Sequence, residues 1–447
     1  MTGITMKTLK RLVFVAGVVA FAASQPAAQQ TGQIGAPVNV PGIDKPVRVI
    51  QGRFTQDVSL SADVYWVLRG AVFIDEPARL TIAPGTRIVG ELATRGTLVI
   101  SPGAQIYAEG TATAPIVMTS DQPIGERGRG DWGGLIINGR APINLPGGTG
   151  FGEGDTGPYG GDNPDDNSGV LRYVRVEYAG IEFSPDNELN GIAFQGVGRG
   201  TVVENVQIHF NRDDGVEFFG GTVDVKRLVL TGIGDDSIDW TFGWTGRLQF
   251  AVVQQRGDDT DNGIEADNNG NNNDLEPRSA PQIYNVTFVG DPGTTYGPES
   301  TDGMRLREGT AGIIRNAIVI GFKSEAVDVR NTSTQNQIAA GTLQVTHSIA
   351  YDNRAFGGGS ASQARNAAGA PLWDPAGHAN STADPMLIDP YNLTAPNWRP
   401  MPDSPALTLA PATPPNDGFF EIALFRGALD ADPAKDWTLG WTNYEQK

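Results

Sequence analysis

Apolar and polar residues alternate in short segments that recur along the middle of the chain. One alternating motif begins at Tyr173, Asn205, Arg227, Phe250, Asn285, Asn316 and His347. A second begins at Asn190, Asp214, Asp236, Asn262, Asp302 and Glu325. The closer repeats are 22 to 26 residues apart, which is too short for a pair of helices and typical of one coil of a β-solenoid.

The pattern extends toward the N-terminus, where LTIAPGTRI (Leu80 to Ile88) is echoed by LVISPGAQI (Leu98 to Ile106). Each unit is an alternating segment, a Pro-Gly turn and another alternating segment. The repeats therefore predict an all-β fold, a right-handed parallel β-helix of about ten coils over residues 47–353. We expect residues 354–447 to close its C-terminal end, because the exposed ends of a β-helix need covers.

Alternation also assigns the two faces of the second motif, because successive side chains of a strand point to opposite sides. Its apolar columns point inward. The outward columns read Ala193, Glu217, Asp239, Glu265, Arg305 and Asp328, then Gln195, Phe219, Thr241, Asp267, Arg307 and Arg330. With coils about 4.8 Å apart, Glu217, Asp239 and Glu265 would form a file of carboxylates. Three such charges need a raised pKa or a bound cation.

Three interpretations of these residues remain open. In the first, Glu217, Asp239 and Glu265 are catalytic, because carboxylates about 5 Å apart suit a retaining glycosidase. Four neighbours would then bind the substrate: Arg305, Arg307, Asp267 and Phe219. Phe219 and Trp244 are the aromatic residues that we expect to be exposed to sugar rings.

In the second interpretation, the aspartates of the turns hold Ca²⁺, a hard cation that prefers oxygen ligands. These metal candidates are Asp213, Asp214, Asp235 and Asp236, and the file residues Glu217, Asp239 and Glu265 would contribute further ligands. In the third, the same aspartates only turn the chain, since Asp-Gly and Asp-Ser favour tight turns, and the carboxylate file is a solvated acidic face.

The N-terminus has the pattern of a signal peptide over residues 1–22, with a basic start and an apolar run from Leu12 to Ala23. Residues 23–46 are expected to be flexible. The apolar run is too short to cross a bilayer, so the expectation is an exported protein without a transmembrane anchor, located in the periplasm, at the cell surface or outside the cell. With 51 acidic and 33 basic residues, the chain is not expected to bind nucleic acid. It has no cysteine and so no thiolate chemistry.

Several segments resemble those of exported bacterial parallel β-helix proteins, a functionally uncharacterised family. They are DWGGLIINGRAPI, GVLRYVRVEYAG, NELNGIAFQGVG, DDGVEFFGGTVDVKRLV and GDDSIDW. The resemblance implies the fold and export but no activity. We therefore expect an envelope-associated structural or binding protein that contacts glycans or another envelope component, with Ca²⁺ as the candidate stabilising ion. The alternative is a polysaccharide hydrolase or lyase that uses the carboxylate file.

Overall fold

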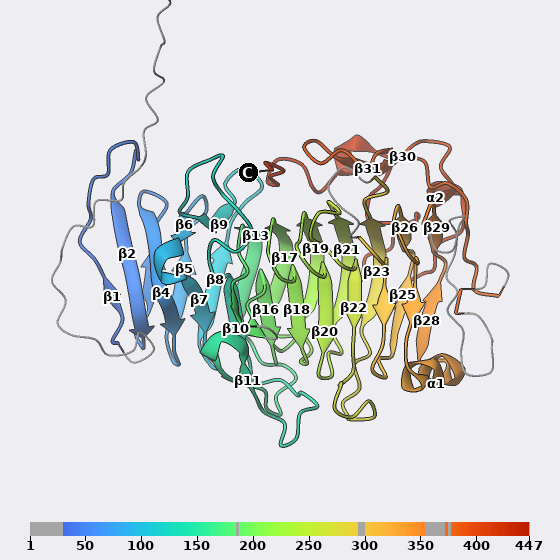
Figure 1. Cartoon of the computed structure of the whole chain (residues 1–447), viewed down its shortest axis with the longest axis horizontal. Coiled ribbons are helices and arrows are strands. Elements are labelled where there is room, and N and C mark those ends of the chain that lie inside the picture. The colour runs from blue at the N-terminus through green and yellow to red at the C-terminus, as the bar shows by residue number, and fades with distance from the viewer. Residues whose placement is uncertain (1–29, 185–186, 294–299, 354–371, 374–376, 447) are drawn as a thin grey trace, which may run out of the picture.

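The computed structural model describes residues 30–184, 187–293, 300–353, 372–373 and 377–446. Their strands wind into a right-handed parallel β-helix, in which each strand pairs in parallel with its counterpart in the next coil (Figure 1). The predicted fold class is therefore confirmed.

Three parallel sheets run along the rod, and we call them sheets I, II and III. Sheet I consists of β2 (Val47–Phe54), β4 (Tyr65–Ile74), β6 (Arg87–Gly90), β9 (Ile116–Ser120), β13 (Gly169–Glu177), β17 (Val202–His209), β19 (Asp224–Thr231), β21 (Arg247–Gln254), β23 (Gln282–Val289), β26 (Ile318–Ile320) and β29 (Ile349–Tyr351). Sheet II begins with the later parts of β2 and β4. It continues through β7 (Thr97–Ile100), β10 (Leu135–Asn138), β16 (Ile192–Gln195), β18 (Val216–Phe219), β20 (Ile238–Thr241), β22 (Ile264–Ala266), β24 (Arg305–Leu306) and β27 (Asp328–Val329).

Sheet III contains β3 (Val58–Leu60), β5 (Arg79–Ile82) and β8 (Gln105–Glu109), then the first halves of β13, β17, β19, β21 and β23, and finally β25 (Gly312–Arg315) and β28 (Leu343–Thr346). Shorter elements lie outside the three sheets. They are β1 (Gln33–Ile34), β11 (Gly150–Gly152), β12 (Gly157–Tyr159), β14 (Glu182–Ser184), β15 (Asn187–Glu188), β30 (Leu387–Asp389), β31 (Asn397–Pro400), the helices α1 (Thr332–Ala340) and α2 (Pro405–Thr408), and the 3-10 turns Leu92–Thr94, Glu153–Asp155 and Pro433–Lys435.

The bend from sheet III to sheet I is a column of left-handed residues. The first residue of every first-motif repeat has a positive φ between 49° and 61°: Tyr173, Asn205, Arg227, Phe250, Asn285, Asn316 and His347. Asparagine tolerates this conformation better than most residues. Asn316 Nδ2 donates to Asn285 Oδ1 at 3.5 Å, whereas Asn205 is separated from them by Arg227 and Phe250.

The core is a column of apolar side chains inside the coils. Phe194 stacks on Phe218 with ring centres 5.3 Å apart, and Phe218 stacks on Trp244 at 3.9 Å. Trp244 is fully buried, so the expectation that it is exposed was wrong. Its indole N–H donates to the carbonyl of Val223, which lets the whole ring enter the core.

The first described residues differ from the expected flexible segment. From residue 30 onward the chain lies against β2, where β1 pairs in antiparallel register and Val38 bridges to Val47. None of the described helices is long and apolar enough to cross a membrane.

The C-terminal segment covers more than the end of the rod. Leu372 and Trp373 join the main core, and α1 contacts β28 at the last coils. The chain after α2, however, runs back along sheet I as far as β13 (Figure 1). The reason is that the outward side chains of sheet I become apolar toward the C-terminus. Val229, Val252 and Ile318 are buried beneath this returning segment.

Candidate functional site

The predicted carboxylate file exists on the outer face of sheet II. Glu217 in β18 pairs with Asp239 in β20, and Asp239 pairs with Glu265 in β22. The next two members of the column are Arg305 and Asp328, as the alternation predicted. The repeat therefore gave the correct register and the correct outward face for all five residues.

The turn aspartates lie immediately beside this file. Asp214 Oδ1 accepts a hydrogen bond from the backbone N–H of Asp236 at 3.1 Å, and Asp236 Oδ1 accepts from that of Asn262 at 2.7 Å. These bonds tie each coil to the next, which is a structural task. The two carboxyl groups are nevertheless almost fully buried and belong to the same group of acids as the file.

Eight acidic residues form this group, which we call the carboxylate cluster. It divides into four overlapping sets, and in each set one oxygen per residue lies within 4.8 Å of the others. The sets are Asp213, Asp214 and Asp235; Asp214, Glu217 and Asp239; Asp235, Asp236 and Asp261; and Asp236, Asp239 and Glu265. The turn and strand carboxylates therefore form one group, as the calcium interpretation of the sequence assumed, because residues three apart at the start of a strand here face the same cavity.

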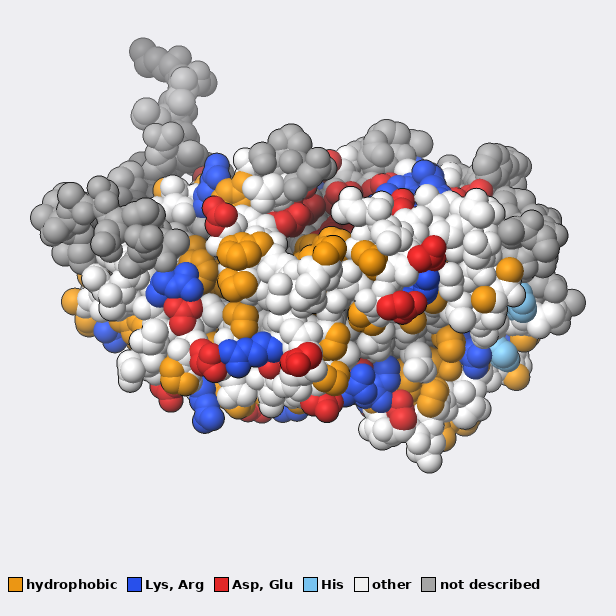
Figure 2. All heavy atoms as spheres, turned by 90° about the horizontal axis from the view of Figure 1, so that it is seen from below, with side chains coloured by type: hydrophobic (Ala, Val, Ile, Leu, Met, Phe, Trp, Pro, Cys, Tyr) orange, Lys and Arg blue, Asp and Glu red, His pale blue; other side chains and the backbone are white. Residues whose placement is uncertain are grey.

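A loop of residues 144–169, which contains the β11–β12 hairpin, covers part of the cluster. Together they form a pocket of about 480 Å³, lined by every acid of the cluster except Asp261 and by Phe151, Tyr159 and Phe242 among others. Figure 2 shows the molecule from the side on which this loop projects, and acidic side chains gather around a hollow on that face. We call this hollow the carboxylate pocket.

Phe219 points outward as expected, but the loop buries it. Its side chain is 6% exposed and lies between Tyr159 and Phe242, with ring centres at 6.1 and 6.2 Å. It supports the wall of the pocket and does not offer a free face to a sugar. Phe151, in the middle of β11, is 74% exposed and is the aromatic residue that the repeat pattern did not single out.

The two predicted arginines neutralise only one end of the cluster. Arg307 Nε donates to Asp267 Oδ1 at 2.8 Å, and its Nη2 forms an ion pair with Glu265. Arg305 pairs with Asp261 at 2.8 Å and with Asp302 at 2.9 Å. No arginine or lysine among the described residues forms an ion pair with the carboxylates at the other end, Asp213, Asp214, Glu217 and Asp239.

Burial, together with the neighbouring negative charges, raises the pKa of the cluster's acids that line the pocket. Burial, with the neighbouring carboxylates second, raises the pKa of Asp213 to about 8 and that of Asp235 to about 6. Burial also raises the pKa of Glu265 to about 7, although Arg307 opposes the change. The pKa values of Glu217 and Asp239 lie well above the ordinary range for the same reasons. At neutral pH the site needs protons or a cation.

Several buried oxygens at the pocket have no hydrogen-bond donor within the described part of the chain. They are Asp239 Oδ1, Gln195 Oε1 and Asn190 Oδ1. The Gln195 side chain is 1% exposed and lines the pocket, and Asn190 Nδ2 donates to Glu217 Oε2 at 2.6 Å. Unpaired buried acceptors are costly, and a Ca²⁺ ion takes six to eight oxygen ligands of this kind. The residues present therefore fit such a cation.

Comparison with known families agrees with this architecture. Residues 52–367 match the family model described as a pectate-lyase-like beta helix domain. Because the match spans more than half of the chain, the protein belongs to this family. Comparison with the curated proteins and with the solved structures gave no significant match.

Proposed function

We propose that this protein is an exported glycan-binding protein whose carboxylate pocket holds a divalent cation, Ca²⁺ by its chemistry. One observation carries the proposal: a cluster of eight carboxylates, of which Asp214 and Asp236 are buried, is balanced by arginines at one end only and contains a buried acceptor oxygen without a donor, Asp239 Oδ1. The pectate-lyase-like domain supports a carbohydrate as the partner, although a fold alone does not fix a function.

Two overlapping sets of residues would hold the cation. The first is Asp214, Glu217 and Asp239, and the second is Asp236, Asp239 and Glu265. Asp239 belongs to both, and its Oδ1 is one of the unpaired buried oxygens. A bound cation would neutralise these carboxylates and offer coordination positions to sugar oxygens. Phe151 and Thr241 would contact the sugar at the mouth of the same pocket.

Calorimetric titration of the chelator-treated protein with Ca²⁺ and with Mg²⁺ tests the cation site. We expect Ca²⁺ to bind more tightly, because the cluster is irregular and rich in oxygens whereas Mg²⁺ demands near-ideal octahedral geometry. Asp239→Asn should weaken Ca²⁺ binding at least ten-fold. Glu109→Gln, which changes an exposed acid paired with Arg172 on another sheet, is the matched control. Equal affinity in Asp239→Asn and in the control would refute the site.

Binding of oligogalacturonides and of neutral oligosaccharides, each with Ca²⁺ and with EDTA, tests the glycan. We expect a component of the glycan binding that requires Ca²⁺ and that Asp239→Asn abolishes. Calcium binding without any Ca²⁺-dependent glycan binding would retain the metal site and overturn the glycan role of the carboxylate pocket.

A second candidate function is glycoside hydrolysis. Glu217 and Asp239 bring carboxylate oxygens within 4.8 Å of each other, and their raised pKa values keep a proton available at neutral pH, as a general acid requires. New reducing ends that disappear in Glu217→Gln would favour this function over binding alone.

A lyase reaction with an arginine base has less support. Burial lowers the pKa of Arg305 and of Arg307, but the neighbouring carboxylates more than offset this and leave both pKa values raised. Both guanidinium groups are therefore held in the protonated form, which cannot accept a proton from a substrate.

A further inference from the structure

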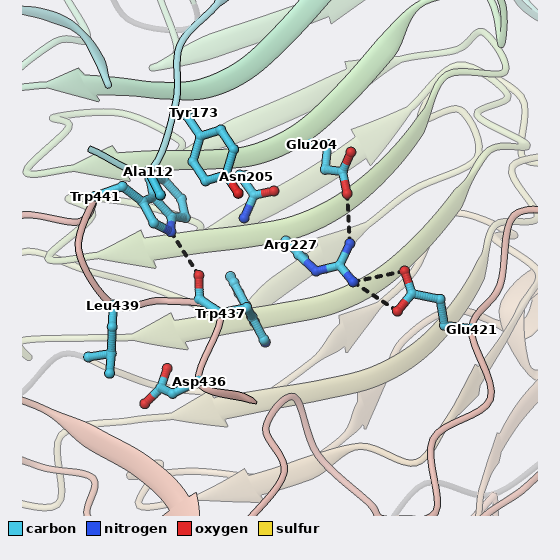
Figure 3. Close-up of a pocket in the computed structure, with 10 residues that line it drawn as sticks. All are labelled: Ala112, Tyr173, Glu204, Asn205, Arg227, Glu421, Asp436, Trp437, Leu439 and Trp441. Carbon is cyan, nitrogen blue, oxygen red and sulfur yellow. Dashed lines mark hydrogen bonds and ion pairs between the residues drawn. The ribbon is translucent and has the colours of Figure 1, made fainter. Parts of the chain in front are cut away.

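A second cavity, of about 440 Å³, lies on sheet I beneath the returning C-terminal segment. Figure 3 shows its lining: Tyr173 and Asn205 from the bend column, Arg227 with its ion-pair partners on one side, and Trp437, Leu439 and Trp441 from the last part of the chain. We call it the Asn205 cavity. It is separate from the carboxylate pocket, which lies on sheet II.

The amide of Asn205 has an unusual position within its column. The side chain is 4% exposed, and it makes no hydrogen bond within the described part of the chain. Asn285 and Asn316, at the same position of later coils, are satisfied by the C-terminal segment. Asn285 Nδ2 donates to the carbonyl of Phe425 at 2.8 Å, and Asn316 Nδ2 donates to that of Ala412 at 2.9 Å. Beside Asn205 the described part of the chain offers no such main-chain carbonyl, and the cavity lies where it would be.

The route of the C-terminal segment explains this gap. The chain first follows the bend column from Ala412 to Glu421, which pairs with Arg227, and then returns to Asn316, where Gly427 bonds to the backbone. Its final part crosses to β13, where Trp441 packs against Tyr173. Asn205 lies between the outward run and this final part, so neither covers its amide.

The charges around the cavity are paired. Arg227 donates to Glu204 at 2.7 Å and to both oxygens of Glu421 at 2.8 Å. Asp436 accepts from Thr438 and lies 3.5 Å from Arg399. A charged ligand would have to break one of these pairs, whereas a neutral ligand would leave them intact. The carboxylate oxygens that remain at the rim can accept hydrogen bonds from hydroxyl groups.

The aromatic residues have their polar atoms satisfied elsewhere. Trp441 Nε1 donates to the carbonyl of Trp437 at 2.8 Å, and Trp437 Nε1 donates to that of Ala428 at 2.9 Å. Trp437 is half-buried, so part of its ring is available to a ligand. The cavity thus combines aromatic surface, one free amide and acceptor oxygens.

We propose that the Asn205 cavity is a binding subsite for a neutral sugar residue of a glycan chain. The Asn205 amide donates to one sugar oxygen and accepts from a neighbouring hydroxyl group, in the place of the main-chain contacts made at Asn285 and Asn316. The apolar face of the sugar ring packs on Trp437. The subsite does not depend on a cation, because Glu204, Glu421 and Asp436 are already paired.

Isothermal titration calorimetry with neutral oligosaccharides of glucose, mannose, galactose and xylose tests this subsite. At least one of them should bind, and Asn205→Gly and Trp437→Ala should each weaken its binding at least ten-fold. Glycine suits the positive φ of position 205, and Asn205→Asp, which removes the donor and keeps the shape, is the second variant there. Leu424→Ala, an exposed residue of the same segment outside the cavity, is the matched control.

EDTA and Glu217→Gln should leave this binding unchanged, which distinguishes it from binding at the carboxylate pocket. The subsite is refuted if no neutral oligosaccharide binds. It is also refuted if the binding survives in the folded Asn205 and Trp437 variants, or if it disappears with EDTA.

Discussion

Without a divalent cation, the carboxylate cluster should make the protein less stable as the pH rises. Asp213, Asp235 and Glu265 have folded-state pKa values above their ordinary values, so between the two values the folded state holds more protons than the unfolded state. The stability that these protonated acids contribute is fully present below about pH 4. It is lost as the pH rises through the folded-state pKa values of about 6 to 8. This is the opposite of the behaviour of a salt-bridged carboxylate.

The magnitude can be worked from Glu265, whose side chain is 12% exposed. Its pKa rises from 4.5 to about 7, and each unit corresponds to about 1.36 kcal/mol, so ionising it in the folded state costs about 3 kcal/mol. Part of this cost is already present at pH 5, so about 2.5 kcal/mol of stability is lost between pH 5 and pH 8. At roughly 2 °C per kcal/mol, Glu265 alone should lower Tm by about 5 °C over that range. Calcium at about 100 times its Kd should raise the free energy of unfolding by about 2.7 kcal/mol.

Differential scanning fluorimetry over this pH range, in EDTA and in Ca²⁺, measures the effect. The decline in EDTA should become shallower in Glu265→Gln and stay unchanged in Glu109→Gln. The stabilisation by Ca²⁺ should grow with pH, since the cation competes with protons for the same oxygens. A Tm that rises from pH 5 to pH 8 in EDTA, or an equal decline in wild type and Glu265→Gln, would refute the reasoning.

Three further changes test the packing and the charges. Phe218→Ala removes a ring stacked between Phe194 and Trp244. It should lower the free energy of unfolding, measured in urea, by about 3–5 kcal/mol. Arg307→Gln leaves Asp267 without its cation and leaves Glu265 with only the longer ion pair to Arg305, at 3.7 Å. It should lower Tm in EDTA and increase the stabilisation by Ca²⁺, and an unchanged calcium response would contradict the charge argument. Deleting the chain from Gly427 onward uncovers Val252 and Ile318. It should cause self-association visible by light scattering, and a monodisperse product would show that the cover is dispensable.

Much of the fold was predictable because a solenoid is set by local periodicity. The alternation assigned Glu217, Asp239 and Glu265 to one outward column, and the coil spacing placed them in adjacent strands, as observed. The apolar columns that it pointed inward, which include Trp240, lie in the core. These features depend on side-chain period and on contacts between neighbouring coils, both of which the sequence repeats.

The covers of the rod were not predictable in the same way. The loop that buries Phe219 and the segment that packs Trp441 on Tyr173 make contacts across long sequence separations, and neither segment repeats. One signal was present and was not used: the outward positions Val229, Val252 and Ile318 are apolar. An apolar outward column predicts a cover, but it does not predict which segment supplies it.

Both candidate sites arise where such a cover meets a ladder of polar residues from the coils. On sheet II the ladder is acidic, and the loop that covers it supplies no arginine or lysine. The carboxylates there therefore lack a balancing positive charge. On sheet I the bend ladder carries neutral amides, and the C-terminal segment satisfies those of Asn285 and Asn316 but leaves Asn205 free beside its own tryptophans. The coils thus determine which polar groups each ladder carries. The covering segments determine which of these groups stay accessible to a ligand. Substitutions in the covers should therefore change which of these groups a ligand can reach, whereas substitutions in the coils, such as Asp239→Asn and Asn205→Gly, remove the binding groups themselves.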